Sequence, residues 1–330
     1  MSRGFDSFDL DDFRGSDSGF ERGMGGGSNS SWDNWRERQN IYREEERSDA
    51  LAREGQQRSG RDRPPVRREE RVREVVQQRI RTNYTDRNKS YSLRDSEIHS
   101  LAEVGKFRVV AKNDLAEFAY NGDRHRMEND VESLERQGLA RVTTIPNVEY
   151  NPIEVVTLTK DGHRMLSRGQ VVRRDQATYH GLKKPREAAH DADLYRLYNK
   201  VSDEIESRGG RVLRVRLDYE IKDELYSRIA RTAKDRGVKP EAIRREVAER
   251  YYLKPVLGKI PIPDLRIEYV NENDNQIQHR DLELATDHYR PRGLSEKVRA
   301  GFQIYARPEE TSRLRRIRDE RELTAAIYSL

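Results

Sequence analysis

Two stretches of sequence determine how the C-terminal half of this chain folds: Pro263-Asp264-Leu265-Arg266-Ile267-Glu268-Tyr269 and, after it, Asp281-Leu282-Glu283-Leu284-Ala285. The polar residues 271–276 lie between the two stretches and predict a turn, so the stretches are expected to pair as an antiparallel hairpin. The two-residue period of a strand then sorts the side chains by face. One face is expected to carry Asp264, Arg266 and Glu268 on the first strand and His279, Asp281, Glu283 and Ala285 on the second.

This hairpin is expected to bring the carboxylates of Asp264 and Glu283 together. Carboxylate oxygens are ligands that Mg²⁺ prefers, and a bound cation lowers the pKa of its water and stabilises charge on a phosphate. Asp264 and Glu283 therefore predict a site that cleaves a phosphodiester with the help of Mg²⁺.

The segments around the hairpin predict helices and one further strand. A long helix begins near His190 and ends at Gly209-Gly210, and a strand follows at Val212–Tyr219. Two charged helices are expected at 222–236 and 240–252. After the hairpin, an amphipathic helix is expected to carry Lys297, Val298, Phe302 and Tyr305.

The order of helix, strand, hairpin and helix, with Pro-Asp and then an acidic residue, resembles the PD-(D/E)xK nuclease superfamily. The chain departs from that pattern at Ala285, where the superfamily usually carries a lysine. Some members carry this lysine on the following helix, so the resemblance implies catalytic roles for Asp264, Glu283 and Lys297. It further implies metal ligation by Asp264, Glu283 and Glu204. A degenerate domain that only packs or grips DNA, and an unrelated α/β domain, stay open as alternatives. His190 is expected to cap a helix or join the core rather than to act in catalysis.

Residues 89–170 predict a winged helix-turn-helix domain. A helix opens at Leu93–Ile98, a shorter helix ends at Tyr120, and a third helix extends from about Asp123 to Gln137. Asn121-Gly122 is expected to form the turn between the last two helices, and Gly138 is expected to end the third. Two strands follow at 140–145 and 155–159, a loop at 146–152 forms the wing between them, and a short helix at 164–167 closes the unit.

The third helix of such a domain enters the major groove of DNA. The candidate DNA-binding residues are Arg124, His125, Arg126, Asn129, Ser133 and Arg136. Four acidic residues on the same helix oppose phosphate binding, so a role in docking to another protein remains the alternative.

Composition sets the remaining bounds. The chain has 330 residues, 64 Lys and Arg against 59 Asp and Glu, and a formal net charge of +5. It has no cysteine, which excludes disulfides, thiolate-bound zinc and thiol catalysis. The sequence contains no apolar stretch long enough to span a membrane, its first residues do not read as a signal peptide, and the expected location is the cytoplasm.

Changes in composition suggest six segments in an α/β (α+β) protein with two folded domains. They are a disordered Gly/Ser-rich tail at 1–40, a charged helical linker at 41–88, the winged helix at 89–170, a linker at 171–188, the nuclease-like domain at 189–307 and a basic helix at 308–330.

The combination of a winged helix, a His-Asp pair at the start of a long helix, a Pro-Asp strand and a lysine-bearing helix resembles the replication-relaxation family of plasmids and integrative elements. This resemblance implies a DNA-binding protein of a mobile genetic element that acts in replication, relaxation or conjugative transfer. Its expected partners are double-stranded DNA, other relaxosome or replication proteins, and a second copy of the chain. Two alternatives are kept: an active Mg²⁺-dependent nuclease, and a transcription regulator that uses only the winged helix.

Overall fold

A computed structural model describes residues 80–146, 152–169, 171–182, 187–271, 274–286, 291–320 and 326–330. The expected tail at 1–40, nearly all of the charged linker and the centre of the expected wing lie outside these residues. The end of the linker is not helical. Strands β1 (Thr82–Asp86) and β2 (Lys89–Leu93) form an antiparallel hairpin there, with Tyr84 paired to Tyr91 and both rings buried.

The hairpin leads into a unit of four helices and three strands. These are α3 (Asp95–Lys106), β3 (Val110–Ala111), α4 (Lys112–Ala119), α5 (Arg124–Arg136), β4 (Ala140–Ile145), β5 (Ile153–Leu158) and α6 (Lys160–Gly169). The strands form an antiparallel sheet in the order β3-β5-β4. The predicted helices and two of these strands are confirmed in their predicted order. Strand β3 was not predicted, because its two residues are too few to show a periodic pattern.

Local backbone geometry explains where α5 begins and ends. Asn121 and Gly122 both have positive φ, at 52° and 83°, and form the predicted turn before the helix. The Asp123 carboxylate then accepts a hydrogen bond from the Arg126 N–H and caps the helix. Gly138, with φ of 71°, ends it as predicted.

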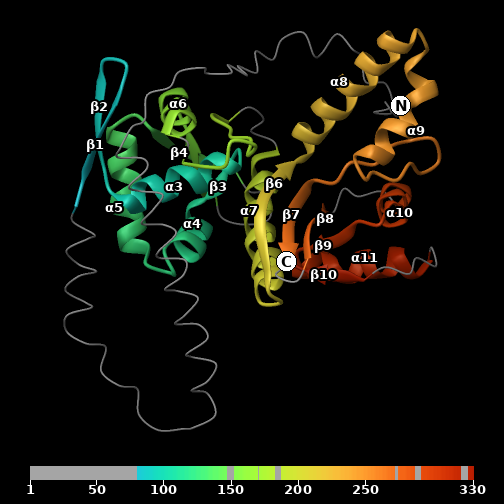
Figure 1. The fold of residues 1–330 in the computed structure, drawn as a ribbon. Coiled ribbons are helices and arrows are strands. Elements are labelled where there is room, and N and C mark those ends of the chain that lie inside the picture. The colour runs from blue at the N-terminus through green and yellow to red at the C-terminus, as the bar shows by residue number, and fades with distance from the viewer. Residues whose placement is uncertain are drawn as a thin grey trace.

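The C-terminal part of the chain is a mixed sheet with helices on both faces (Figure 1). Its elements are α7 (Ala188–Glu206), β6 (Gly210–Leu217), α8 (Asp218–Arg236), α9 (Pro240–Arg250), β7 (Leu265–Asn271), β8 (Asp274–Ala285), α10 (Pro291–Ala300), β9 (Gln303–Ala306), α11 (Pro308–Glu320) and β10 (Ile327–Ser329). The strand order is β10-β9-β8-β7-β6. Strands β6, β7 and β8 pair antiparallel, whereas β8, β9 and β10 pair parallel. The expected α/β (α+β) class is confirmed at this level.

Three expected boundaries in this region were wrong. Tyr219 lies on α8 rather than on the strand before it, and Tyr305 lies on β9 rather than on the helix with Lys297. Gly301, with φ of 95°, ends that helix early, and residues 303–306 pair with β8 instead. The expected C-terminal helix is also divided, because Ile327 belongs to β10, which pairs with β9.

The two faces of the sheet differ in character. Leu265, Ile267, Leu282 and Leu284 pack against the apolar side of α7. The opposite face carries charged side chains, among them Arg266, which is 3% exposed. Arg266 forms a bidentate ion pair with the Asp281 carboxylate, with N–O distances of 2.6 and 2.8 Å. This face alternation is the one predicted from the sequence.

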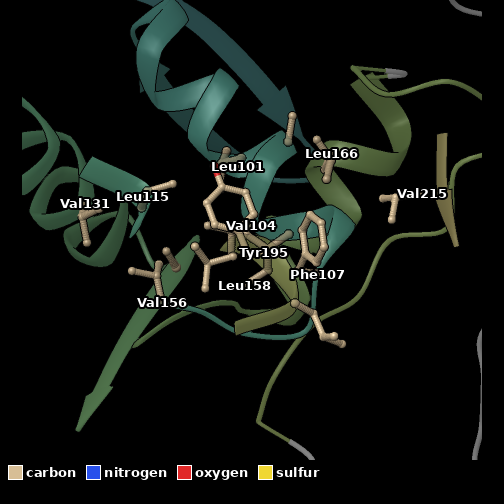
Figure 2. Packing of buried hydrophobic residues seen from close by; sticks show 14 of the residues in the cluster. Leu101, Val104, Phe107, Leu115, Val131, Val156, Leu158, Leu166, Tyr195 and Val215 are labelled. Atoms are coloured by element: carbon tan, nitrogen blue, oxygen red, sulfur yellow. The ribbon is translucent and has the colours of Figure 1, made fainter. Parts of the chain in front are cut away.

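One hydrophobic core extends from the helical unit into the sheet. Figure 2 shows Phe107, at the end of α3, next to Tyr195 of α7, and their ring centroids lie 5.2 Å apart edge to face. The segment between α6 and α7 makes a second contact with the sheet, because the Gln176 side chain forms two hydrogen bonds with the backbone of Val215 on β6. The two parts of the molecule are therefore packed against each other.

Candidate functional site

Asp264 and Glu283 meet at one end of the hairpin, as predicted. The register of β7 and β8 pairs Leu265 with Leu282, so the next residue outward on each strand places Asp264 opposite Glu283. The Asp264 carboxylate accepts a hydrogen bond from the Leu284 N–H at 3.0 Å. Glu283 is 1% exposed. The strands thus hold two carboxylates in a largely buried position at the edge where β8 and β9 end.

Lys297 reaches the same place from α10. Its Nζ lies 2.8 Å from the Glu283 carboxylate and donates a hydrogen bond to the Ile262 carbonyl at 2.6 Å. Ala285, two residues after Glu283 on the same face of β8, is fully buried and has only a methyl side chain. The helix therefore supplies the ammonium group that position 285 lacks.

His190 also belongs to this site, although the sequence favoured a capping or core role for it. It lies in the first turn of α7, with Nε2 3.5 Å from an Asp264 oxygen and Nδ1 3.9 Å from Asp191. The His-Asp pair at the helix start was visible in the sequence. The approach of α7 to the end of β7, which brings His190 to Asp264, was not.

Neighbouring charges separate the protonation states of these groups. Burial and the charge of Asp264 raise the pKa of Glu283 to about 8, against the opposing effect of the Lys297 ammonium. Burial also disfavours ionised Asp264, but its hydrogen bond with His190 and the nearby positive charges hold its pKa below the ordinary value. Burial disfavours charged His190 as well, yet Asp191 and Asp264 raise its pKa well above the ordinary value. One site thus contains an ionised carboxylate, a carboxyl group that holds its proton near neutral pH, and two cations.

The expectation that Glu204 is the third metal ligand was wrong. Its carboxylate lies 3.4 Å from Arg280, on the surface of α7. Arg280 and Glu283 are three residues apart on β8, so their side chains leave opposite faces of the sheet. Glu204 therefore belongs to the other side of the sheet.

The remaining groups suit a cation that completes its coordination from outside the protein. Among the described residues, no three His, Asp or Glu side chains gather closely enough to hold a metal by themselves. Mg²⁺ is commonly held by one or two carboxylates together with waters and substrate phosphates. The mutual repulsion of Asp264 and Glu283, which raises the Glu283 pKa, is the electrostatic feature that such a cation would relieve.

The candidate DNA-binding residues of α5 are divided between its exposed and buried sides. Arg124, His125, Asn129 and Arg136 are exposed. Arg124 donates a hydrogen bond to the Asn113 side chain at 2.6 Å. Arg126 is half-buried, with its guanidinium 6.0 Å from the centre of the Tyr120 ring.

Ser133 does not face outward, and the structure corrects that expectation. Its side chain is 5% exposed, and its hydroxyl accepts hydrogen bonds from Arg81 at 3.2 Å and Gln137 at 3.3 Å. Arg81 lies just before β1, so the unpredicted hairpin covers this side of α5. The sequence offered no sign of that contact.

Comparison with known proteins leaves the chain without an assigned family. No family model matches it, and neither a curated protein nor a solved structure is similar to it. Within the residues that the structure describes, no helix has the length and apolar character to cross a lipid bilayer.

Proposed function

We propose that this chain binds double-stranded DNA and cleaves a phosphodiester bond at the Asp264, Glu283 and Lys297 site. The carrying observation is the convergence of these three residues, which come from β7, β8 and α10. Two facing carboxylates with an ammonium beside them are a combination suited to phosphate chemistry, in which catalysis depends on positioning and charge stabilisation.

Each side chain of the site has a separate role in this proposal. Asp264 is held in its ionised form by His190 and the Leu284 N–H, and with Glu283 it supplies the carboxylates for a divalent cation. Such a cation, when bound, lowers the pKa of water and stabilises charge on the phosphate. Lys297 contacts the Glu283 carboxyl group in the free protein and supplies a positive charge for a phosphate oxygen when DNA is present.

The helical unit supplies DNA recognition in this proposal. Helices α3, α4 and α5 followed by β4 and β5 have the element order of a winged helix-turn-helix, whose third helix enters the major groove. The exposed positions of Arg124, Asn129 and Arg136 support contact between α5 and DNA. A DNA-binding unit joined to a phosphodiester site suits replication, relaxation or transfer of a mobile element, as the resemblance to the replication-relaxation family implies.

Cleavage of supercoiled and linear DNA with Mg²⁺ or Mn²⁺ tests the proposal. Asp264→Asn and Glu283→Gln are expected to abolish cleavage, and Lys297→Ala is expected to reduce it by a factor of about 10² or more. Asp264→Asn and Glu283→Gln should keep the DNA affinity of the wild type, because α5 lies elsewhere. Glu204→Gln serves as the matched acidic control and should cleave normally.

Three results would contradict the proposal in different ways. Cleavage that survives in Asp264→Asn would place the chemistry elsewhere. DNA binding by the wild type without cleavage under any divalent cation would leave a DNA-binding protein with a degenerate site. Absence of DNA binding would remove the proposal as a whole.

A further inference from the structure

Helices α8 and α9 form an arm that extends away from the five-stranded sheet in Figure 1. The two helices of the arm pack against each other, because Ile221, Leu225 and Ile229 of α8 lie in one hydrophobic cluster with Ile243 and Val247 of α9. Arg236 of α8 forms an ion pair with Glu246 of α9 and joins the two helices further, while Arg250 pairs with the same Glu246 within α9. This packing gives the end of the arm a defined shape.

The arm is tied to the candidate site at its base. Helix α8 begins directly after β6, and the Asp218 N–H donates a hydrogen bond to the Asp264 carbonyl at 3.1 Å. At the end of α9, the Tyr251 carbonyl accepts a hydrogen bond from Arg266 of β7 at 2.7 Å. The arm therefore has a fixed origin beside the carboxylates.

Charge is segregated along the arm. Residues 218–227 contain four acidic residues and one lysine, and three of those acids form ion pairs at the base, with Arg216 or Lys222. Residues 228–245 contain seven Lys or Arg and only two acidic residues. The base is thus internally neutralised, and the outer end carries excess positive charge.

Three of these cations form a stripe on the side of α8 that faces away from α9. Arg228, Arg231 and Lys234 follow each other at three-residue spacing, opposite the buried Ile229 and Ala233. All three are exposed, and none takes part in an ion pair or hydrogen bond within the described part of the chain. A stripe of unpaired cations on a rigid helix matches the phosphate backbone of a nucleic acid, which carries a dense line of negative charge.

We propose that the stripe Arg228, Arg231 and Lys234 binds the phosphate backbone of duplex DNA that flanks the site at Asp264. This inference rests on the proposed DNA binding and adds a second contact surface outside α5. Arg231 is 13 residues from Asp218, which is about 20 Å along a helix. A duplex that follows the arm is therefore held about six base pairs from the site, at 3.4 Å per base pair.

The test compares Arg228→Gln/Arg231→Gln with Arg208→Gln/Arg211→Gln. The control removes the same two charges from exposed positions around the turn after α7, at the end of β6 opposite to the start of α8. Binding of a 40-base-pair duplex is measured over a range of salt concentrations. The arm variant is expected to lose at least tenfold in affinity at low salt, with the slope of log K against log salt reduced by about 2. The control should keep the wild-type slope.

Duplex length gives a second readout. Duplexes that extend fewer than about six base pairs beyond the site on the arm side should bind wild type and arm variant equally. Circular dichroism and thermal unfolding of the arm variant should match the wild type, since both side chains are exposed. Equal affinity and equal salt slope for arm variant and wild type on the long duplex would overturn the inference.

The outcome separates this inference from the proposed function. If the wild type fails to bind any duplex, the proposed function is contradicted. If the arm variant binds the duplex as tightly as the wild type, only the proposed role of the arm is contradicted. Vesicles with 30% phosphatidylserine serve as an alternative polyanion. If the arm variant loses vesicle binding but keeps DNA binding, the stripe fits a lipid surface and the assignment to DNA is wrong.

Discussion

Glu283 and Asp264 show how two identical functional groups come to hold different charges at one site. Both are carboxyls at facing positions, yet Asp264 accepts a backbone N–H and lies beside a histidine, while Glu283 is buried and hydrogen-bonded by Lys297. The difference in their pKa values follows from these partners and not from the residue types. The sequence could indicate that the two acids meet, but not which of them would hold a proton.

Protonation of Glu283 predicts how stability changes with pH. A carboxyl whose pKa is raised to about 8 in the folded state, from an ordinary 4.5, favours folding while it stays protonated. The free energy of unfolding should therefore fall as pH rises from about 5 to 8, by at most about 4 kcal/mol. The raised pKa of His190 acts in the same direction above pH 6.5, whereas Asp264 loses its contribution only below its ordinary pKa of 3.8.

Glu283→Gln should flatten this dependence, because the amide keeps a polar partner for Lys297 and does not titrate. Urea unfolding at pH 5, 6.5 and 8 measures the effect. Glu246→Gln, on the exposed surface of α9, is the control and should retain the wild-type dependence. An unchanged slope in Glu283→Gln would show that Glu283 is ionised throughout this range.

Among the elements, strands β7 and β8 were predictable and the segments after them were less so. Alternation along residues 264–268 and 279–285 determines faces and, with the turn, register. The amphipathic pattern through Lys297 and Val298 continues through Phe302 and Tyr305, so periodicity alone does not show where the helix ends. Residues 303–306 form strand β9 because they pair with the edge of β8. Such pairing depends on tertiary structure, and the pattern of a short apolar segment does not predict it.

The Arg266–Asp281 pair connects β7, β8 and the end of α9, so its loss is expected to disturb all three elements. Asp281→Ala leaves the guanidinium buried without its carboxylate and should destabilise the fold by about 3–5 kcal/mol. Glu246→Ala, which removes the exposed partner of Arg236, should cause a much smaller change. Chemical denaturation of both variants measures the comparison, and equal losses would mean that burial of Arg266 does not determine the cost.

At the scale of the whole molecule, the helical unit and the sheet share a core centred on Phe107 and Tyr195. The sequence indicated two groups of elements with a linker between them. It gave no signal that Arg196 of α7 would pair with Asp114 of α4 at 2.8 Å, because contacts between distant segments leave no local pattern.

Phe107→Ala should therefore lower the stability of both parts together. The expected loss is about 3–5 kcal/mol, from the cavity and the lost apolar contacts. Differential scanning calorimetry should show one transition in wild type and variant, shifted to lower temperature in the variant. Tyr252→Ala, at a side chain that is 75% exposed, is the control and should leave the transition in place. Two resolved transitions would show that the parts unfold independently.

The shared core also limits how such a protein can be rearranged in evolution or in the laboratory. A fragment that stops after α6 would lose Tyr195 and the rest of α7, and would present the ring of Phe107 to water together with neighbouring apolar side chains. Large exposed apolar patches promote association. Moving the unit that extends from α3 to α6 onto another protein would therefore require α7 as well, so the smallest segment that can be exchanged is longer than that unit.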